Sequence, residues 1–222
     1  MQESEAEAMR LCQQGDISGL EILVHRYQLA ALRLAYLVIG ERALAEDIVQ
    51  DSFLHVYRAS TQFRVNSPFA PWFYQIVLNT ARQHRRKASQ HATVSLDDLV
   101  GASIDDRASY QNMAQRGPSI ADPYQQVERT EQREAIVKAL AQLTPKQREA
   151  IILRYYYGFN EREMATILRC LTGTVKWRLH AGMQALERAI RSQCAWLIEQ
   201  SPAETVPEKL LVVIPRKDTQ NA

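Results

Sequence analysis

The chain contains few glycines and cysteines for its length, and each shortage limits what it can be. Only 8 of 222 residues are glycine, while Ala, Leu, Gln, Arg and Glu are frequent, a composition that favours helix over sheet. The three cysteines, Cys12, Cys170 and Cys194, are scattered and lack metal-ligand spacing. That pattern is typical of a protein from a reducing compartment.

The sequence also lacks a long apolar run. The longest such run, Leu34 to Ile39, is far too short to cross a bilayer, and the acidic, polar N-terminus is not a signal peptide. Hydrophobic residues make up 46% of the chain and charged residues 23%, which predicts a folded, soluble protein. We therefore expect a cytoplasmic protein without membrane insertion.

A catalytic constellation is missing as well. The sequence contains neither a Gly-rich phosphate-binding loop nor a nucleophile in a known motif. Its five histidines are dispersed along the chain: His25, His55, His84, His91 and His180. These features predict a protein that is not an enzyme and that has neither a metal nor a cofactor.

Hydrophobic periodicity in residues 1–88 predicts three helices. Apolar residues recur at helical spacing from Leu20 to Val38, with Asp16 as a suitable N-cap and Gly40 as a suitable end. A second helix is expected from about residue 43 to 59, and a third has Pro71 in its first turn and ends near Lys87. Together they predict a compact helical bundle.

Residues 89–130 have no sustained period and carry three basic against six acidic residues. A connection of this length is unusual inside one domain, so we interpret it as a flexible linker between two domains. The tail, residues 196–222, contains Pro202, Pro207 and Pro215 and is expected to be loose. The sequence thus predicts an all-α protein, in which a helical bundle and a C-terminal helix-turn-helix are joined by a linker.

The second domain is expected at residues 131–195, which hold eleven basic and six acidic residues. Helical order begins at Asp122-Pro123, Thr144-Pro145 separates two helices, and Gly158 ends the second. Asn160 with Glu163 has the form of a capping box that opens a short helix. A last helix is predicted from residue 173 to about 196, with Thr172 as its N-cap.

The two helices after Asn160 have the spacing of a helix-turn-helix. Val175 and Leu179 would face inward, which leaves a polar and basic set at the N-terminal end of the last helix for a DNA groove. That set is Thr172, Thr174, Lys176, Trp177, Arg178, His180 and Ala181. On spacing alone, a plain helical hairpin with a solvated basic face is the alternative.

Three segments here resemble the last conserved region of bacterial RNA polymerase sigma factors: Leu143–Glu149, Glu163–Leu168 and Gly173–Ala181. The likeness is greatest to the extracytoplasmic-function (ECF) group of the sigma-70 family. Independently, Ala45–Phe53 resembles the family's polymerase-binding helix and Phe69–Arg82 its promoter-melting segment. Trp177 departs from the family, which usually has a small polar residue there, and Ala181-Gly182 stands where basic side chains are frequent.

The resemblance implies a non-enzymatic specificity subunit, with core RNA polymerase (its beta-prime clamp region) and promoter DNA as partners. An anti-sigma factor is a further candidate partner. On the second helix, one face would dock on the polymerase through Asp47, Gln50, Asp51 and Leu54, although a solvated acidic face is the simpler interpretation of the pattern alone. Asp47 and Asp51 are expected to be dispensable for folding.

The resemblance also implies that Asn79 helps to capture a flipped base of the downstream (−10) element. Basic residues beside aromatic rings suit single-stranded DNA, because phosphates need charge and unpaired bases need a π face. The candidates are Trp72, Asn79, Arg82, Arg85, Arg86 and Lys87, and the −35 reader is the last helix. Against this, Trp72 and Phe73 suit a core, and the basic run could simply complement the helix end.

Two other functions fit a helix-turn-helix. An autonomous regulator would need a receiver or ligand-binding domain, and residues 1–88 lack the strand pattern of one. A DNA recombinase would need an activated Ser or Tyr among arginines on an α/β scaffold, which the sequence does not contain. Co-purification with core polymerase separates a sigma factor from both.

Overall fold

The computed structural model of the chain describes residues 4–64, 67–92 and 135–193. Within those ranges every regular element is helical, as predicted. The expected linker beyond residue 92, the helix start at Asp122-Pro123 and the tail 196–222 lie outside the described residues.

The N-terminal part is a bundle built around α2 (Ser18–Ile39), which packs against α1 (Glu5–Gln13), α3 (Arg42–Arg58) and α4 (Phe69–Ala92). A short 3-10 turn, Ser60–Gln62, follows α3. The predicted end of α2 at Gly40 is confirmed, with a φ of 88°. The predicted N-cap is one residue too early, because Ile17 is the N-cap, although Asp16 Oδ1 accepts a hydrogen bond from the Ser18 amide (2.9 Å). Helix α1 was not predicted from the sequence.

In the C-terminal part, a helical segment at residues 135–141 precedes α7 (Pro145–Ile151), α8 (Glu161–Leu168) and α9 (Thr172–Gln193). Thr144 and Asn160 both form capping boxes, with Gln147 and Glu163 respectively. Thr172 was expected to cap α9 but lies within it, and the Leu171 carbonyl accepts the bond from the Val175 amide (3.1 Å). The predicted cap is therefore one residue too late.

Between α7 and α8 the helix widens into one π-helical turn, Ile152–Tyr156. The sequence predicted one continuous helix here. The wider turn lets Ile151, Ile152 and Leu153 all be buried together with Tyr156, which a regular helix with one buried stripe does not favour. Gly158, at a φ of 72°, ends the element as expected.

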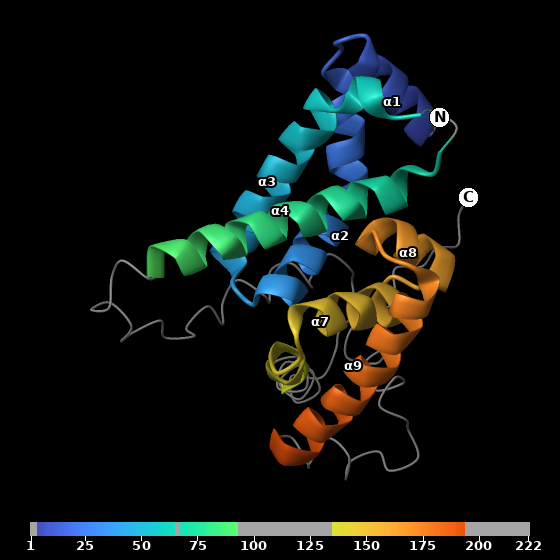
Figure 1. The fold of residues 1–222 in the computed structure, drawn as a ribbon. Helices are drawn as coiled ribbons and strands as arrows, with labels where there is room; N and C mark the ends of the chain where they lie inside the picture. The colour runs from blue at the N-terminus through green and yellow to red at the C-terminus, as the bar shows by residue number, and fades with distance from the viewer. Residues whose placement is uncertain (1–3, 65–66, 93–134, 194–222) are drawn as a thin grey trace, which may run out of the picture.

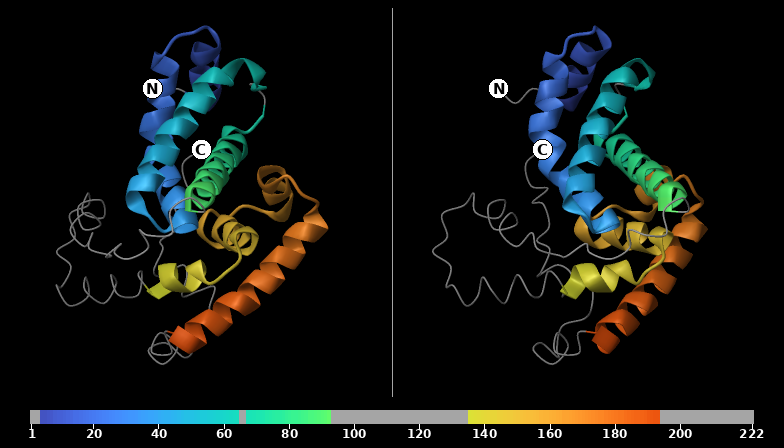
Figure 2. Two further views of the ribbon diagram at one scale, coloured as in Figure 1. Left: turned by 60° about the vertical axis from the view of Figure 1, so that its left-hand side comes forward. Right: turned by 90° about the vertical axis from the view of Figure 1, so that its left-hand side faces the viewer.

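The two parts pack against each other. Helix α4 crosses the lower end of the N-terminal bundle and faces α8, while α7 lies beneath α2 (Figures 1 and 2). The Tyr74 ring of α4 packs at a tilt against Tyr157 (ring centroids 4.7 Å apart) and edge-on against Phe159 (5.6 Å), and the Tyr157 hydroxyl donates to the Ala30 carbonyl (2.6 Å). The sequence contained no sign of this contact.

Among the described helices, α2 alone is long and apolar enough to cross a membrane by length and composition. In the fold it is the central helix of the bundle, and nine of its residues, including Leu23, Ala31 and Leu34, are buried against its neighbours. Its apolar character is therefore explained by its place in the core.

Candidate nucleic-acid interface

Helix α3 presents a polar face with one apolar residue at its centre. Ile48, Val49 and Phe53 are buried, whereas Asp47 and Gln50 are exposed and Leu54 is 48% exposed. A single exposed leucine is common on protein surfaces, so Leu54 is a candidate contact residue only together with the polar residues of the same helix face. We call Asp47, Gln50, Asp51 and Leu54 the α3 surface.

Asp51 differs from the rest of the α3 surface because it contacts α4. Its Oδ2 lies 2.9 Å from Nε2 of His84, and about half of the Asp51 side chain remains exposed. This contact joins α3 to α4, so Asp51 also has a structural role. The expectation that Asp51 is dispensable for folding is therefore weakened, while that for the exposed Asp47 stands.

An aromatic cluster occupies the start of α4. Phe69, Phe73 and Tyr74 are buried, and Trp72 is half-buried, with its ring 4.8 Å from Phe63 and 5.9 Å from Phe69. Phe73 is thus a core residue. Trp72 has both a packing role and an edge accessible to solvent, so a stacking role for it stays a prediction.

Asn79 and Arg82 lie one turn apart on α4 and bind each other, with Arg82 Nη1 donating to Asn79 Oδ1 (2.9 Å). The same guanidinium makes two bonds to the carboxylate of Glu149 on α7, through Nε (3.0 Å) and Nη2 (2.5 Å). The Glu149 side chain is 1% exposed. Two of the predicted DNA contacts are therefore engaged within the protein.

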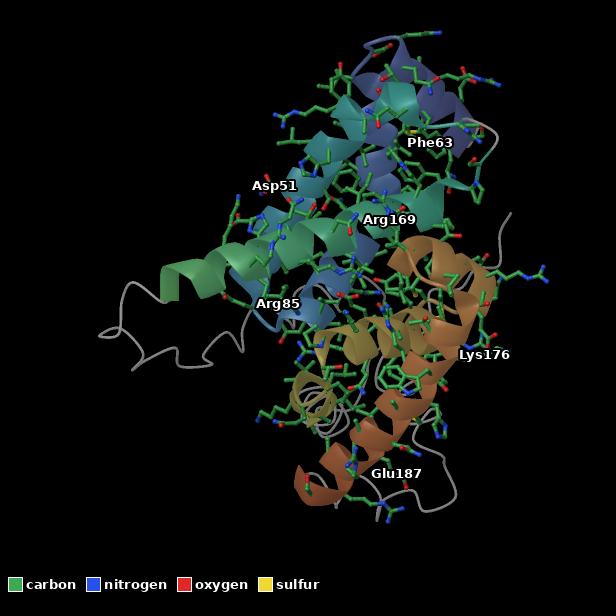
Figure 3. All side chains as sticks on the ribbon, viewed as in Figure 1. Asp51, Phe63, Arg85, Arg169, Lys176 and Glu187 are labelled. Carbon is green, nitrogen blue, oxygen red and sulfur yellow. The ribbon has the colours of Figure 1, made fainter. Side chains whose placement is uncertain are left out.

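The last turns of α4 carry the exposed residues Arg85, Arg86 and Lys87. Figure 3 shows Arg85 where α4 passes the lower part of the structure. Arg85 is close enough to Arg148 of α7 to disfavour its charge, and burial together with this repulsion lowers the pKa of Arg148. Arg148 itself is half-buried and donates to backbone carbonyls, so the exposed basic set is confined to α4.

Helices α8 and α9 form the predicted helix-turn-helix. Asn160 Oδ1 accepts hydrogen bonds from the amides of Arg162 and Glu163 (both 3.0 Å), which fixes the start of α8. The turn between the helices has Arg169 in the left-handed region, at a φ of 49°. The Arg169 guanidinium lies against the Gln75 amide of α4, so this turn is in contact with the N-terminal part.

The first turns of α9 point their polar residues outward. Thr172, Lys176, Trp177 and His180 are exposed, Thr174 and Arg178 are half-buried, and Val175 is buried. Lys176 lies 3.5 Å from Glu161 of α8, an exposed pair on the outer edge of the motif (Figure 3). Such surface pairs are weak, so phosphate can compete for Lys176.

Sequence reasoning missed Glu149, Arg148 and Arg169, all of which link the two parts. Arg148 donates to the Val38 carbonyl at the end of α2 (2.6 Å). A signal for Glu149 was present, because helical spacing places it on the same side as Ile152 and Leu153. A carboxylate on a buried stripe predicts a buried cation nearby, although not which one.

Two family models match the chain. Residues 23–91 match the family described as Sigma-70 region 2, and residues 133–186 match Sigma-70, region 4. The first range covers most of α2 to α4, and the second covers the helix-turn-helix. The two matches occur in the order that the sequence motifs predicted.

Curated relatives and solved structures agree. The chain is 28% identical over 193 residues to the RNA polymerase sigma-H factor of Pseudomonas aeruginosa (86% of this chain, 95% of that protein). It is 30% identical over 183 residues to the ECF RNA polymerase sigma-E factor of Escherichia coli K12 (81% and 90%).

Two solved structures share the fold at a TM-score of 0.60 each. One is CnrH in complex with the cytosolic domain of CnrY (19% identity; 86% of this chain, 99% of that chain). The other is RpoE in complex with the anti-sigma factor NepR from Bartonella quintana (23% identity; 77% and 96%). Taken with the family matches, these findings show that the chain belongs to the sigma-70 family as an ECF RNA polymerase sigma factor, a specificity subunit for transcription initiation and not an enzyme.

Proposed function

We propose that the two helical parts divide the work of promoter recognition. Residues 1–88 bind core polymerase and act on the −10 element, residues 131–195 read the −35 element, and residues 89–130 connect them. The observation that carries this division is the separation of two unlike surfaces, the acidic α3 surface and the basic outward face of α9. No role is assigned to residues 196–222.

The α3 surface is proposed to bind core polymerase at its clamp. Leu54 supplies an apolar anchor, and the carboxylates of Asp47 and Asp51 suit a basic partner. Complementary charge speeds encounter and fixes register, while the anchor contributes most of the affinity. His84 holds Asp51 in place for this contact.

The end of α4 is proposed to bind the melted strand of the −10 element. Arg85, Arg86 and Lys87 are exposed there, and Asn79 and Arg82 lie on the same helix. In this structure the Arg82 guanidinium forms an ion pair with the buried Glu149 carboxylate, so Arg82 is not available to DNA. Release of that ion pair would return Arg82 to the DNA-facing set, so movement of α7 away from α4 is part of the proposal.

Helix α9 is proposed to enter the major groove of the −35 element through Thr172, Thr174, Lys176, Trp177, Arg178 and His180. The N-terminus of a helix also favours phosphate. The protein is proposed to act in the cytoplasm, where it meets core polymerase. An anti-sigma partner is proposed by analogy with the two solved structures, each of which contains a bound partner chain.

Reconstituted transcription tests this assignment. The purified chain is added to core polymerase with a library of genomic fragments, and initiation sites are mapped. We expect the chain to co-purify with core, to direct initiation from a limited set of promoters, and to bind promoter duplex poorly alone. If the free chain bound duplex specifically and core did not bind the chain, the division of labour proposed here would be wrong.

A further inference from the structure

Trp177 is 65% exposed, and it lies on the outward face of the first turns of α9. At 100° per residue, Trp177 points almost directly away from the buried residues Val175 and Leu186 and the half-buried Leu179. In the described part of the chain, Trp177 is not among the ring contacts that join Tyr74 of α4 to Tyr157 and Phe159. Its position is therefore not explained by packing within the chain.

The residues four positions before and after Trp177 on α9 are small. Gly173 precedes it by four residues, and a Cβ atom added there would meet nothing within 4 Å. Ala181 follows it by four residues. The indole therefore projects beyond its neighbours along this face, and a flat or grooved partner would meet it first.

The side chains around Trp177 suit the binding of a polyanion whose groove also presents apolar groups. Lys176 and Arg178 flank the tryptophan, and His180 is exposed one turn on, hydrogen-bonded to Gln184 (3.1 Å). Among the groups that DNA presents in its major groove, the C5-methyl group of thymine is the apolar one. Cations at the edges and an indole at the centre therefore match a thymine-containing groove.

We propose that Trp177 packs on thymine C5-methyl groups in the −35 element and makes this chain select thymine at those positions. The inference rests on the proposed placement of α9 in the major groove, and adds the chemistry by which its central residue discriminates. The bulky indole would also keep other side chains from forming hydrogen bonds with the edge of the same base pair. Discrimination between bases at that position would therefore depend on the methyl group.

The test uses holoenzyme reconstituted from core polymerase and the full chain, with a promoter selected from a library. Each −35 thymine is replaced in turn by deoxyuridine, which removes only the methyl group and keeps base pairing. We expect the parent to lose about three- to five-fold in promoter affinity at one or two positions, the scale of one buried methyl group. Holoenzyme with Trp177→Ala should bind thymine and uracil promoters equally.

Leu171→Ala is the matched control, because Leu171 is 80% exposed but precedes α9 and lies off its outward face. This variant should keep the thymine-to-uracil ratio of the parent. The proposal is overturned if the parent does not distinguish the two bases, or if Trp177→Ala weakens binding while keeping the full ratio. Footprinting of the parent separates this failure from that of the underlying placement, because an unprotected −35 element would show that α9 does not bind there at all.

Discussion

Asp47 and Asp51 lie one turn apart on α3 in different surroundings. Asp51 contacts His84 and so joins two helices, whereas Asp47 is exposed. A change at Asp51 alters both the α3 surface and the helix contact, so its effects on polymerase binding and on folding are mixed. Asp47 reports on the surface alone and is the better probe.

Asp47→Lys should weaken binding to core polymerase about ten-fold or more, because it places a like charge against a basic partner. Exposed charges contribute little to stability, so the free energy of unfolding should change by less than about 0.5 kcal/mol. Glu21→Lys, the same charge reversal at an exposed site on α2, is the control. Pull-down with core and circular dichroism measure the two effects. Equal binding by both variants would remove Asp47 from the polymerase contact.

Tyr157 predicts a pH dependence of stability. Burial raises the pKa of its hydroxyl well above the ordinary value of 10.0, so above pH 10 the unfolded chain loses this proton while the folded chain keeps it. Folding is therefore stabilised fully below pH 10 and less as the pH rises towards the folded pKa. Burial likewise raises the pKa of Tyr74, so both residues contribute.

Tyr157→Phe should make the alkaline loss of stability less steep, since one of the contributing hydroxyls is gone. At neutral pH it should lower the free energy of unfolding by about 1 kcal/mol, because the Ala30 carbonyl loses its donor. Denaturant titrations at pH 7, 10 and 11 measure both effects. Parallel pH profiles for the parent and the variant would contradict the assignment.

At the scale of elements, the close contact between α1 and α2 requires a glycine at residue 19, whereas Gly173 of α9 is not required by any close contact. A Cβ added to Gly19 of α2 would strike the Ala8 carbonyl and lie 2.8 Å from Leu11 Cβ and 2.9 Å from the Cys12 amide nitrogen. Gly173 of α9 has open space at the same position. The two glycines therefore allow one substitution to be compared in opposite environments.

Gly19→Ala should destabilise the fold by about 1–3 kcal/mol, because α1 must move away from α2. Gly173→Ala should be neutral or stabilise by up to about 1 kcal/mol, because alanine favours a helix over glycine. Thermal unfolding of both variants measures the difference. A Gly19→Ala variant as stable as the parent would show that α1 does not pack on α2 as described.

The basic end of α4 is expected to act on separated strands. Replacing Arg85, Arg86 and Lys87 together with alanine should reduce open-complex formation on a duplex promoter far more than on a template with a pre-opened bubble. Permanganate footprinting of holoenzyme on the two templates gives the comparison. An equal loss on both would indicate general attraction to phosphate in place of a melting role.

Element ends were predictable where a side chain stops or starts a helix by its own chemistry. The Asn160–Glu163 capping box, Pro145 at the start of α7 and Gly40 at the end of α2 are all as expected. Helix α1 was missed because its polar composition conceals the short buried stripe of Ala8, Met9 and Cys12. The π-helical turn was missed because periodicity assumes 3.6 residues per turn.

At the scale of the whole molecule, the contact between the two parts is expected to limit the DNA binding proposed for them. The −35 and −10 elements are separated by roughly 85 Å of duplex, at 3.4 Å per base pair. In this structure Arg169, three residues before α9, lies against Gln75 of α4. The basic residues Arg85 to Lys87 follow Gln75 by only about 15 to 18 Å of helix, so the two proposed readers are far closer together than the promoter elements. One promoter cannot reach both readers in this arrangement. We therefore expect the two parts to separate when the holoenzyme binds a promoter.

Glu149→Gln removes one charge from the buried pair with Arg82 and should favour separation. Small-angle scattering should report a larger radius of gyration, and affinity for a single-stranded −10 oligonucleotide should rise several-fold as Arg82 becomes available. Arg82→Ala should also expand the chain but should not gain DNA affinity. Glu187→Gln, at an exposed pair with Arg191, is the control. An unchanged radius for Glu149→Gln would show that this pair does not hold the parts together.

The interiors of both parts followed from periodicity, but their mutual contact did not. Buried positions such as Ile48, Phe73 and Val175 lie on stripes that the sequence displays. The Arg82–Glu149 and Arg148–Val38 contacts join residues far apart in the chain through charges and carbonyls, and such pairings have no periodic signature. The candidate residues could be identified because they lie in recognisable sequence motifs. The contacts of Arg82 with Glu149 and of Asp51 with His84 could not, because they depend on how distant helices pack.

The Arg82–Glu149 pair has a consequence for competition between subunits. If core polymerase binds only the separated form, its apparent affinity for the chain falls in proportion to the fraction that is separated, about ten-fold for a chain that is nine-tenths closed. Any other subunit that competes for the same core polymerase then has an affinity advantage over this chain by the same factor. A substitution at Glu149, whose side chain is buried inside the protein, would then change how much of a limited supply of core this chain captures.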